Sequence, residues 1–211
     1  MKKHFLLGIL VLLMGVSCVA GCAPNNGPDD QAEKSVIETL NTLAAQAPKS
    51  VKLEIGVTVG EDTLKSVYTS TANEGGYAVE YSYQRLNPFV YEDGEYKAPE
   101  EYMSTFKGSM EISDGKIVKQ DGAQTDITAE TVMAFGLRFD ESYFTDFTAE
   151  GGVVTAKVSK PSDFLRQSVS CSDMTLEVKY TESAITNITI SYITETEAEG
   201  RAHVVYKYTL G

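Results

Sequence analysis

Apolar and polar residues alternate along most of the chain after residue 50, and this pattern predicts strands. In VKLEIGVTV, residues 51–59, an apolar residue occupies every second position, which is the spacing of side chains on one face of a strand. Short turns rich in Gly, Asp and Asn separate most of the alternating stretches. We therefore expect an antiparallel meander of about nine or ten strands. Further strands are expected at 64–71, 77–86, 103–112, 116–120, within 143–159 on both sides of a Gly-Gly turn, and at 174–181, 184–196 and 201–210, with a small hairpin around Asp93 and Gly94.

Three other stretches have the three- and four-residue spacing of apolar positions that is typical of helices. The first lies near residues 30–47, where Asp29 or Asp30 is the expected cap and Pro48 the expected stop. Its apolar positions are Val36, Ile37, Leu40, Leu43, Ala44 and Ala47. TAETVMAFGLRF, residues 128–139, is expected to be a short amphipathic helix with Thr128 as cap. KPSDFLRQ, residues 160–167, reads as a helical turn with Pro161 at its first position.

These elements predict an α+β fold in a single domain. A twisted antiparallel sheet of this size tends to curl, so we expect a half-barrel covered by the N-terminal helix and the short mid-chain helices. An open β-sandwich and a large curved sheet without a cavity are the alternatives.

The chain begins with a separate signal. Lys2 and Lys3 precede an almost unbroken apolar run, Phe5 to Val16, and small residues follow it. This order is typical of a secretory signal peptide, and the run is shorter than the roughly 20 residues of a membrane span. We expect residues 1–21 to be the signal peptide.

Val19-Ala20-Gly21-Cys22 resembles the lipobox of bacterial lipoproteins, with Val where Leu is commonest. The resemblance implies that the Cys22 thiol carries a diacylglyceryl group, that the signal is cut before it, and that further acyl chains such as palmitate join the new amino terminus. Acyl chains together anchor a protein firmly. An ordinary secretory signal is the alternative, and Cys18 competes less well because Gly15 lies three residues before it. The expected location is the extracytoplasmic face of the cell membrane, in the cell envelope.

The expected domain organisation follows from this cleavage site. Residues 22–30, rich in Pro, Asn, Gly and Asp, form a lipidated flexible tether, and residues 31–211 form the single half-barrel-like domain. The formal net charge is −12, and loss of Lys2 and Lys3 makes the mature chain more acidic. An acidic surface repels phosphates and anionic headgroups, so we expect no nucleic-acid partner and a membrane contact made only through acyl chains.

The residues that usually carry catalysis are scarce. The two histidines are His4, in the signal, and His203, and the cysteines are Cys18, Cys22 and Cys171, which precludes a disulfide framework in the mature chain and a thiolate or imidazole metal site. Ser113 and Lys116 have the S-x-x-K spacing, but Asp114-Gly115 places them in a hairpin rather than on a helix. The sequence therefore predicts no catalytic residue, no metal and no cofactor, and a protein that is not an enzyme.

Tyrosines instead mark the candidate site. Tyr77, Tyr81 and Tyr83 share one strand face, and Tyr206 and Tyr208 share another. With Met133 and Phe135 of the mid-chain helix, they are the candidates for lining an apolar ligand cavity. An ordinary sheet-on-helix core is the alternative role for the tyrosines.

The order of front helix, meander, mid-chain helices and closing strands is similar to that of the LolA and LolB lipoprotein carriers and the LppX and LprG lipoproteins. This likeness, which lies in the topology of residues 31–211, implies a cavity for acyl chains between sheet and helices. We expect a lipid-anchored protein that binds or carries an apolar ligand such as a lipid. The alternative is an envelope scaffold with a solid core, whose protein partner the sequence does not identify.

Overall fold

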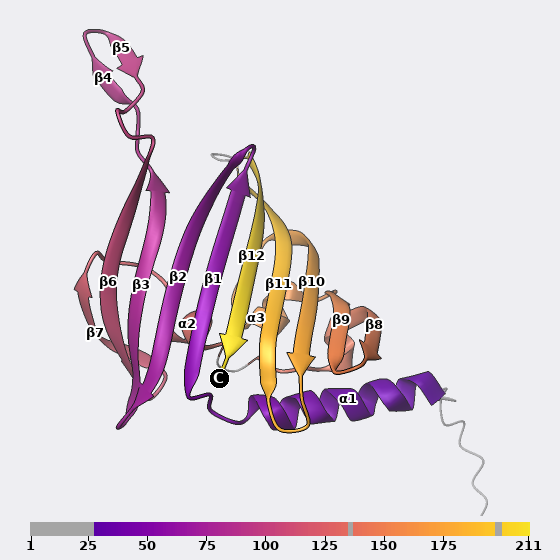
Figure 1. Cartoon of the computed structure of the whole chain (residues 1–211). Coiled ribbons are helices and arrows are strands. Elements are labelled where there is room, and N and C mark those ends of the chain that lie inside the picture. The colour runs from indigo at the N-terminus through magenta and orange to yellow at the C-terminus, as the bar shows by residue number, and fades with distance from the viewer. Residues whose placement is uncertain (1–27, 135–136, 197–199) are drawn as a thin grey trace, which may run out of the picture.

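The computed structural model describes residues 28–134, 137–196 and 200–211, and one large antiparallel sheet dominates it (Figure 1). The ten strands of this sheet are hydrogen-bonded in the order β7-β6-β3-β2-β1-β12-β11-β10-β9-β8. Their bounds are β1 Ser50–Val59, β2 Asp62–Asn73, β3 Gly76–Leu86, β6 Met103–Ser113, β7 Lys116–Gly122, β8 Phe144–Glu150, β9 Val153–Val158, β10 Cys171–Tyr180, β11 Ile185–Thr196 and β12 Gly200–Leu210. The predicted antiparallel sheet of about nine or ten strands is confirmed, but it is not a simple meander, because β1 pairs with β12 and the consecutive strands β7 and β8 lie at opposite edges.

The first and last strands meet in the middle of the sheet. β1 pairs with β2 on one side and with β12 on the other, and Leu53 faces Tyr68 and Tyr208 in these two registers. The N-terminal and C-terminal halves of the domain are thereby joined along one long ladder of hydrogen bonds. The sheet ends at β7 and β8, so it is open and not closed into a barrel.

The inner face of the sheet carries rows of buried side chains. One row crosses seven strands through residues that lie opposite one another in successive registers: Tyr81, Tyr68, Leu53, Tyr208, Ile188, Val178 and Val154. Every member of this row is buried. The alternation predicted from the sequence therefore corresponds to one apolar face and one exposed face.

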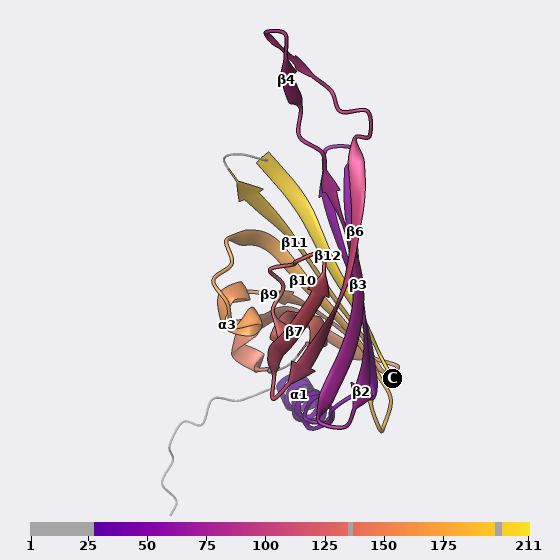
Figure 2. The same cartoon turned by 90° about the vertical axis from the view of Figure 1, so that its left-hand side faces the viewer.

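The described residues form one long helix, α1, and two short ones. α1 spans Pro28–Ala44, α2 Ala129–Met133 and α3 Pro161–Leu165, and a 3-10 turn, η1, spans Glu141–Tyr143. α1 lies across one end of the sheet (Figure 1), and α1 and α3 lie on the same side of the sheet (Figure 2). Ile37, Leu40 and Leu43 form the buried face of α1.

Two helix boundaries differ from the predicted ones. α1 begins at Pro28, so Asp29 and Asp30 lie in its first turn instead of capping it, and the last three residues of the predicted tether are helical. The helix also ends at Ala44, before Pro48. α2 begins at the predicted Thr128 cap, whose side chain accepts from the Thr131 N–H, but ends at Ala134 in the left-handed conformation.

A second, two-stranded sheet projects from the main one. β4 (Val90–Glu92) and β5 (Glu95–Lys97) pair around Asp93 and Gly94, which confirms the predicted hairpin. They lie between β3 and β6 in the chain, and both views show them standing clear of the rest of the molecule at the end opposite α1 (Figures 1 and 2).

The connection between β7 and β8 crosses the whole width of the sheet. β7 and β8 follow one another in sequence but lie at opposite edges of the ten-stranded sheet. Nine inter-strand steps of about 4.8 Å make roughly 43 Å along a flat sheet. The chain between them, residues 123–140, is called the crossing segment below, and it passes over the inner face.

Candidate functional site

Tyrosine hydroxyls attach the start of the crossing segment to the sheet. Tyr81 donates a hydrogen bond to the carbonyl of Ala123, and Tyr83 donates to the carbonyl of Gln124 at 2.7 Å. The hydroxyls of Tyr68 and Thr125 are 3.2 Å apart. Three consecutive residues are therefore fixed by tyrosines from β2 and β3, whose stacked rings form a continuous aromatic surface. A buried phenol needs such a partner.

The middle and the end of the crossing segment have separate attachments. The Tyr208 hydroxyl donates to the Thr131 carbonyl at 2.7 Å, next to the buried Val132 and Met133 of α2. At the far end, the Asn41 side chain of α1 donates to the Phe139 carbonyl at 2.7 Å and accepts from the Phe139 N–H at 3.0 Å. Polar side chains thus satisfy backbone groups that no neighbouring strand pairs.

A first cavity lies between these attachments and the end of α3. This cavity, called the α3 cavity, has a volume of about 390 Å³. It is lined by Thr128, Glu130, Thr131, Ala134, Leu137, Leu165, Arg166, Gln167, Ile190, Tyr206 and Tyr208. Its floor is the inner face of β11 and β12, and charged and amide groups from α2 and the end of α3 lie beside apolar ones.

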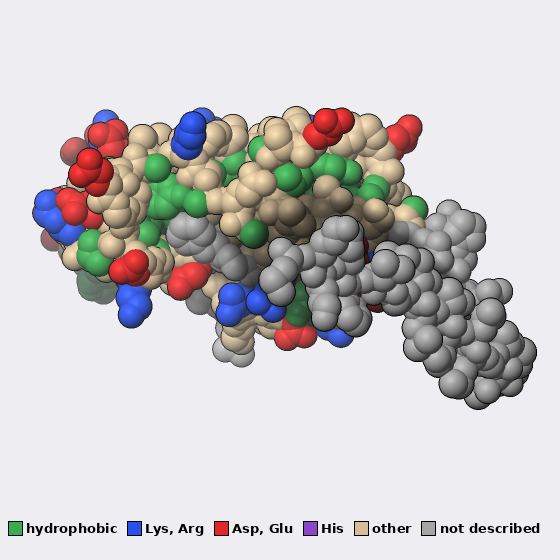
Figure 3. All heavy atoms as spheres, turned by 90° about the horizontal axis from the view of Figure 1, so that it is seen from below, with side chains coloured by type: hydrophobic (Ala, Val, Ile, Leu, Met, Phe, Trp, Pro, Cys, Tyr) green, Lys and Arg blue, Asp and Glu red, His purple; other side chains and the backbone are tan. Residues whose placement is uncertain are grey.

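A second cavity, called the α1 cavity, has a volume of about 440 Å³ and lies at the end of the sheet where α1 stops. Its walls are the apolar or small residues Leu43, Ala44, Ala45, Ala47, Pro48, Met133, Ala134, Leu137, Phe139, Ala184, Ile185, Ile188, Leu210 and Gly211, together with Gln46 and Lys49. From below, hydrophobic side chains lie along the middle of this end of the molecule and charged ones lie toward its rim (Figure 3).

The two cavities meet at the crossing segment. Ala134 and Leu137 line both of them, so these two residues lie where the cavities adjoin. Together the cavities extend from the end of α3 to the end of α1 along the inner face. Volumes in this range are those of small-molecule sites, about 300–1,000 Å³.

Burial keeps the phenols around the α3 cavity neutral. It raises the pKa of Tyr208 far above its ordinary value of 10.0, with the neighbouring Tyr206 adding to the effect. Burial also raises the pKa of Tyr192, which stacks on Tyr206 with ring centroids 6.1 Å apart. These groups act as hydrogen-bond donors and apolar surface rather than as bases.

The residues predicted to line a cavity have three different positions. Tyr206 and Tyr208 line the α3 cavity, and Met133 lines the α1 cavity. Tyr77, Tyr81 and Tyr83 are buried, lie outside the lining of both cavities and donate to the carbonyls of Pro48, Ala123 and Gln124. Phe135 and Cys22 lie outside the described residues.

Sequence reasoning did not find Leu137, Ile190 and Arg166 as cavity residues. Ile190 has the same alternation as any inward-facing strand residue, and Arg166 reaches the cavity because it ends α3 with a φ of 54°. The sequence feature that indicated polar contacts at this site is the presence of Tyr rather than Phe at inward-facing strand positions, since a buried hydroxyl needs a hydrogen-bond partner nearby.

Within the ranges described, no cluster of three or more His, Cys, Asp or Glu side chains is placed to hold a metal ion. The same residues contain no helix with the length and apolar character needed to cross a bilayer.

Comparisons with known proteins give little further information. No protein-family model matches the chain, and no curated protein matches it. Among solved structures, a protein of the DUF1329 family from Desulfovibrio piger is similar at 7% identity, covering 85% of this chain and 90% of its own, with a TM-score of 0.29. A likeness at this level carries no argument about function.

Proposed function

We propose that this protein is a lipid-anchored lipoprotein of the cell envelope that binds or carries an apolar ligand between its sheet and its crossing segment. The sheet with α1, α2 and α3 on its inner face constitutes a helix-covered half-barrel in this proposal. Cys22 is the acylated residue, and it precedes α1 by only a few positions.

The observation that carries the proposal is the pair of cavities that meet at Ala134 and Leu137. A scaffold with a solid core needs neither of them. The α1 cavity is the more apolar of the two, with Gln46 and Lys49 as its longer polar side chains, whereas Glu130, Arg166 and Gln167 line the α3 cavity. This distribution suits a ligand with an apolar body and a polar end, because a few polar groups orient a ligand that apolar surface binds.

Binding is tested with cis-parinaric acid, a fluorescent fatty acid, on the purified full chain. Leu137→Trp places a larger side chain at the junction of both cavities and should weaken binding at least tenfold. Arg138→Trp is the matched control, since Arg138 is exposed and outside both linings, and it should bind as the parent does. Equal binding by all three proteins, or none by the parent, would refute a ligand role.

The anchor is tested separately by phase partitioning in Triton X-114. The parent should enter the detergent phase, and Cys22→Ser should stay in the aqueous phase because the thiol of the lipobox is gone. A Cys22→Ser protein that still partitions into detergent would remove the lipoprotein assignment without affecting the cavity test.

A further inference from the structure

The β4–β5 arm, defined as residues 87–102, is a separate unit on the sheet. β3 and β6 stay paired in register as far as Leu86 and Met103, so a tight turn could join them without the arm. Both views show the arm extending beyond this point, away from the sheet and from α1 (Figures 1 and 2). The side chains of the arm are therefore not needed to fill the core of the sheet.

The base of the arm is fixed. The Asn87 N–H donates to the Tyr102 carbonyl at 2.9 Å, and the Asn87 amide donates to the Glu101 carbonyl at 2.6 Å and to the Ser104 hydroxyl at 2.8 Å. The Tyr102 hydroxyl donates to the carboxylate of Asp62, the first residue of β2, at 3.2 Å. These bonds give the arm a defined direction.

Most of the large apolar side chains exposed in the described ranges are concentrated here. Phe89, Val90, Tyr91, Tyr96 and Tyr102 all belong to the arm, with Tyr91 62% and Tyr96 75% exposed. Tyr91 and Tyr96 are opposite one another in register, with ring centroids 4.9 Å apart. Exposed apolar side chains gathered in one segment are typical of an interaction site, and tyrosine is enriched in such sites.

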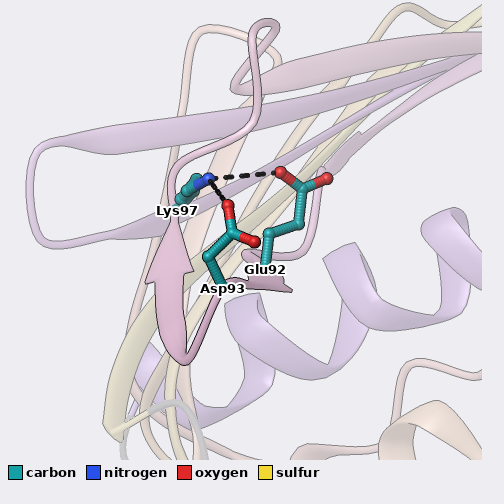
Figure 4. A network of polar contacts seen from close by, with 3 residues as sticks. All are labelled: Glu92, Asp93 and Lys97. Carbon is teal, nitrogen blue, oxygen red and sulfur yellow. Dashed lines mark hydrogen bonds and ion pairs between the residues drawn. The ribbon is translucent and has the colours of Figure 1, made fainter.

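The charge around these aromatics is strongly negative. The arm contains five acidic residues and one lysine. Glu92 and Glu95 face each other across the hairpin, an arrangement that destabilises it. Lys97 lies between two carboxylates, 3.4 Å from Glu92 and 3.2 Å from Asp93 (Figure 4). Since one lysine offsets only one of the five negative charges, the arm keeps a net negative charge.

We propose that the β4–β5 arm is a docking element for a protein whose binding surface is apolar and bordered by Lys or Arg side chains. The aromatic face supplies the buried contact, and the carboxylates pair with the basic rim and steer association. A second copy of this chain, with a formal net charge of −12, and an anionic bilayer would both repel the arm. The inference does not depend on the ligand cavity.

The test uses a phage-displayed random peptide library selected on the purified full chain. Enriched peptides should combine aromatic or aliphatic residues with Lys or Arg, and their affinity should fall as salt is raised. Tyr91→Ser with Tyr96→Ser should weaken them at least tenfold, and so should Glu92→Lys with Glu95→Lys, which keeps the aromatics. Val118→Ser removes an equally exposed apolar side chain, 61% exposed, from β7 and should change nothing.

Several outcomes would overturn the proposal. These are a library that yields no arm-dependent peptide, enriched peptides without basic residues, and equal binding to the parent and to both arm variants. Arm-dependent sedimentation with phosphatidylcholine–phosphatidylglycerol vesicles would assign the arm to a bilayer instead. Arm-dependent dimerisation in sedimentation equilibrium would assign it to a second copy.

Discussion

Replacing Asn41 by alanine tests whether the crossing segment holds α1 on the sheet. The Asn41 amide makes two hydrogen bonds to the backbone of Phe139, at 2.7 and 3.0 Å, across 98 positions of sequence. Both bonds are partly buried, and Phe139 itself packs against Phe144 and Phe164 with centroids 6.4 Å away in each case. The variant removes both bonds and leaves the Phe139 backbone groups without this partner.

The expected loss follows from the number of bonds. A hydrogen bond contributes about 0.5–1.5 kcal/mol net, so two of them give about 1–3 kcal/mol, with about 2 kcal/mol as the central value. A domain of 150–250 residues loses about 2–4 °C in Tm per kcal/mol. We therefore expect Tm to fall by about 4–8 °C in Asn41→Ala.

The assay is thermal unfolding for Tm and urea unfolding for the free energy, both followed by circular dichroism, with Thr42→Ala as the control. Thr42 is the neighbouring residue of α1, and its exposed hydroxyl donates to the Glu38 carbonyl at 2.9 Å within the same helix. Its removal should change the free energy of unfolding by at most about 0.5 kcal/mol. If the two variants lose the same stability, the Asn41–Phe139 pairing is not what attaches α1.

Three further perturbations are expected to change the stability of the protein. Ser70→Ala should raise the free energy of unfolding by about 1 kcal/mol or more in urea titration, because the Ser70 hydroxyl is buried with no hydrogen-bond partner among the described residues; a loss of stability would contradict this. Gly108→Ala should cost about 1–3 kcal/mol in the same assay, since a Cβ there would lie 2.7 Å from the Asp121 carbonyl oxygen and would press on the Tyr81 ring; an unchanged midpoint would contradict it. Stability should fall above about pH 10, where phenols ionise in the unfolded chain, because burial raises the pKa of Tyr192 and Tyr208 in the folded protein. Tyr208→Phe should reduce that pH dependence, as measured by unfolding at pH 8 and pH 11, and an unchanged dependence would contradict the assignment.

Local alternation was sufficient to predict the strands. VKLEIGVTV forms β1, and the strand predicted at 77–86 is β3, Gly76–Leu86. Each strand has a more buried face, and a shift of the register by one residue would expose the apolar side chains of that face. The start of β10 was missed: the strand begins at Cys171, three residues before the predicted Met174. Its register shifts between Ser172 and Thr175, and Asp173 has a positive φ of 53°. A bulge of this kind breaks the two-residue period on which the prediction depends.

Helix ends were predicted less well because their stop signals are not glycines. Ala134 ends α2 and Arg166 ends α3 in the left-handed conformation, which is rare for residues with a Cβ. The sequence contains no indication of either stop. The expected helix over residues 128–139 was therefore too long, whereas the Thr128 cap, which acts through a local hydrogen bond, was predicted correctly.

The candidate site could not be predicted from local sequence patterns, because it depends on the order of the strands in the sheet. Strands β7 and β8 are neighbours in sequence and lie at opposite edges of the sheet, and this order alone creates the crossing segment. The tyrosines of β3 were predicted to share a face, and they do. That their hydroxyls would bind the backbone of the crossing segment could not be deduced without knowing where the segment runs.

The attachments of the crossing segment also determine where the proposed ligand would lie. Outside the five-residue helix α2, the described residues of the crossing segment lie in no helix or strand, so side chains of the sheet and of α1 satisfy several of their backbone groups. Tyr208 binds the segment at Thr131 and Asn41 binds it at Phe139. Ala134 and Leu137, which line both cavities, lie between these two points. The ligand would therefore contact the part of the segment that is held at its two ends, and loosening either end, by Tyr208→Phe or Asn41→Ala, should weaken cis-parinaric acid binding, whereas Thr42→Ala should leave it unchanged.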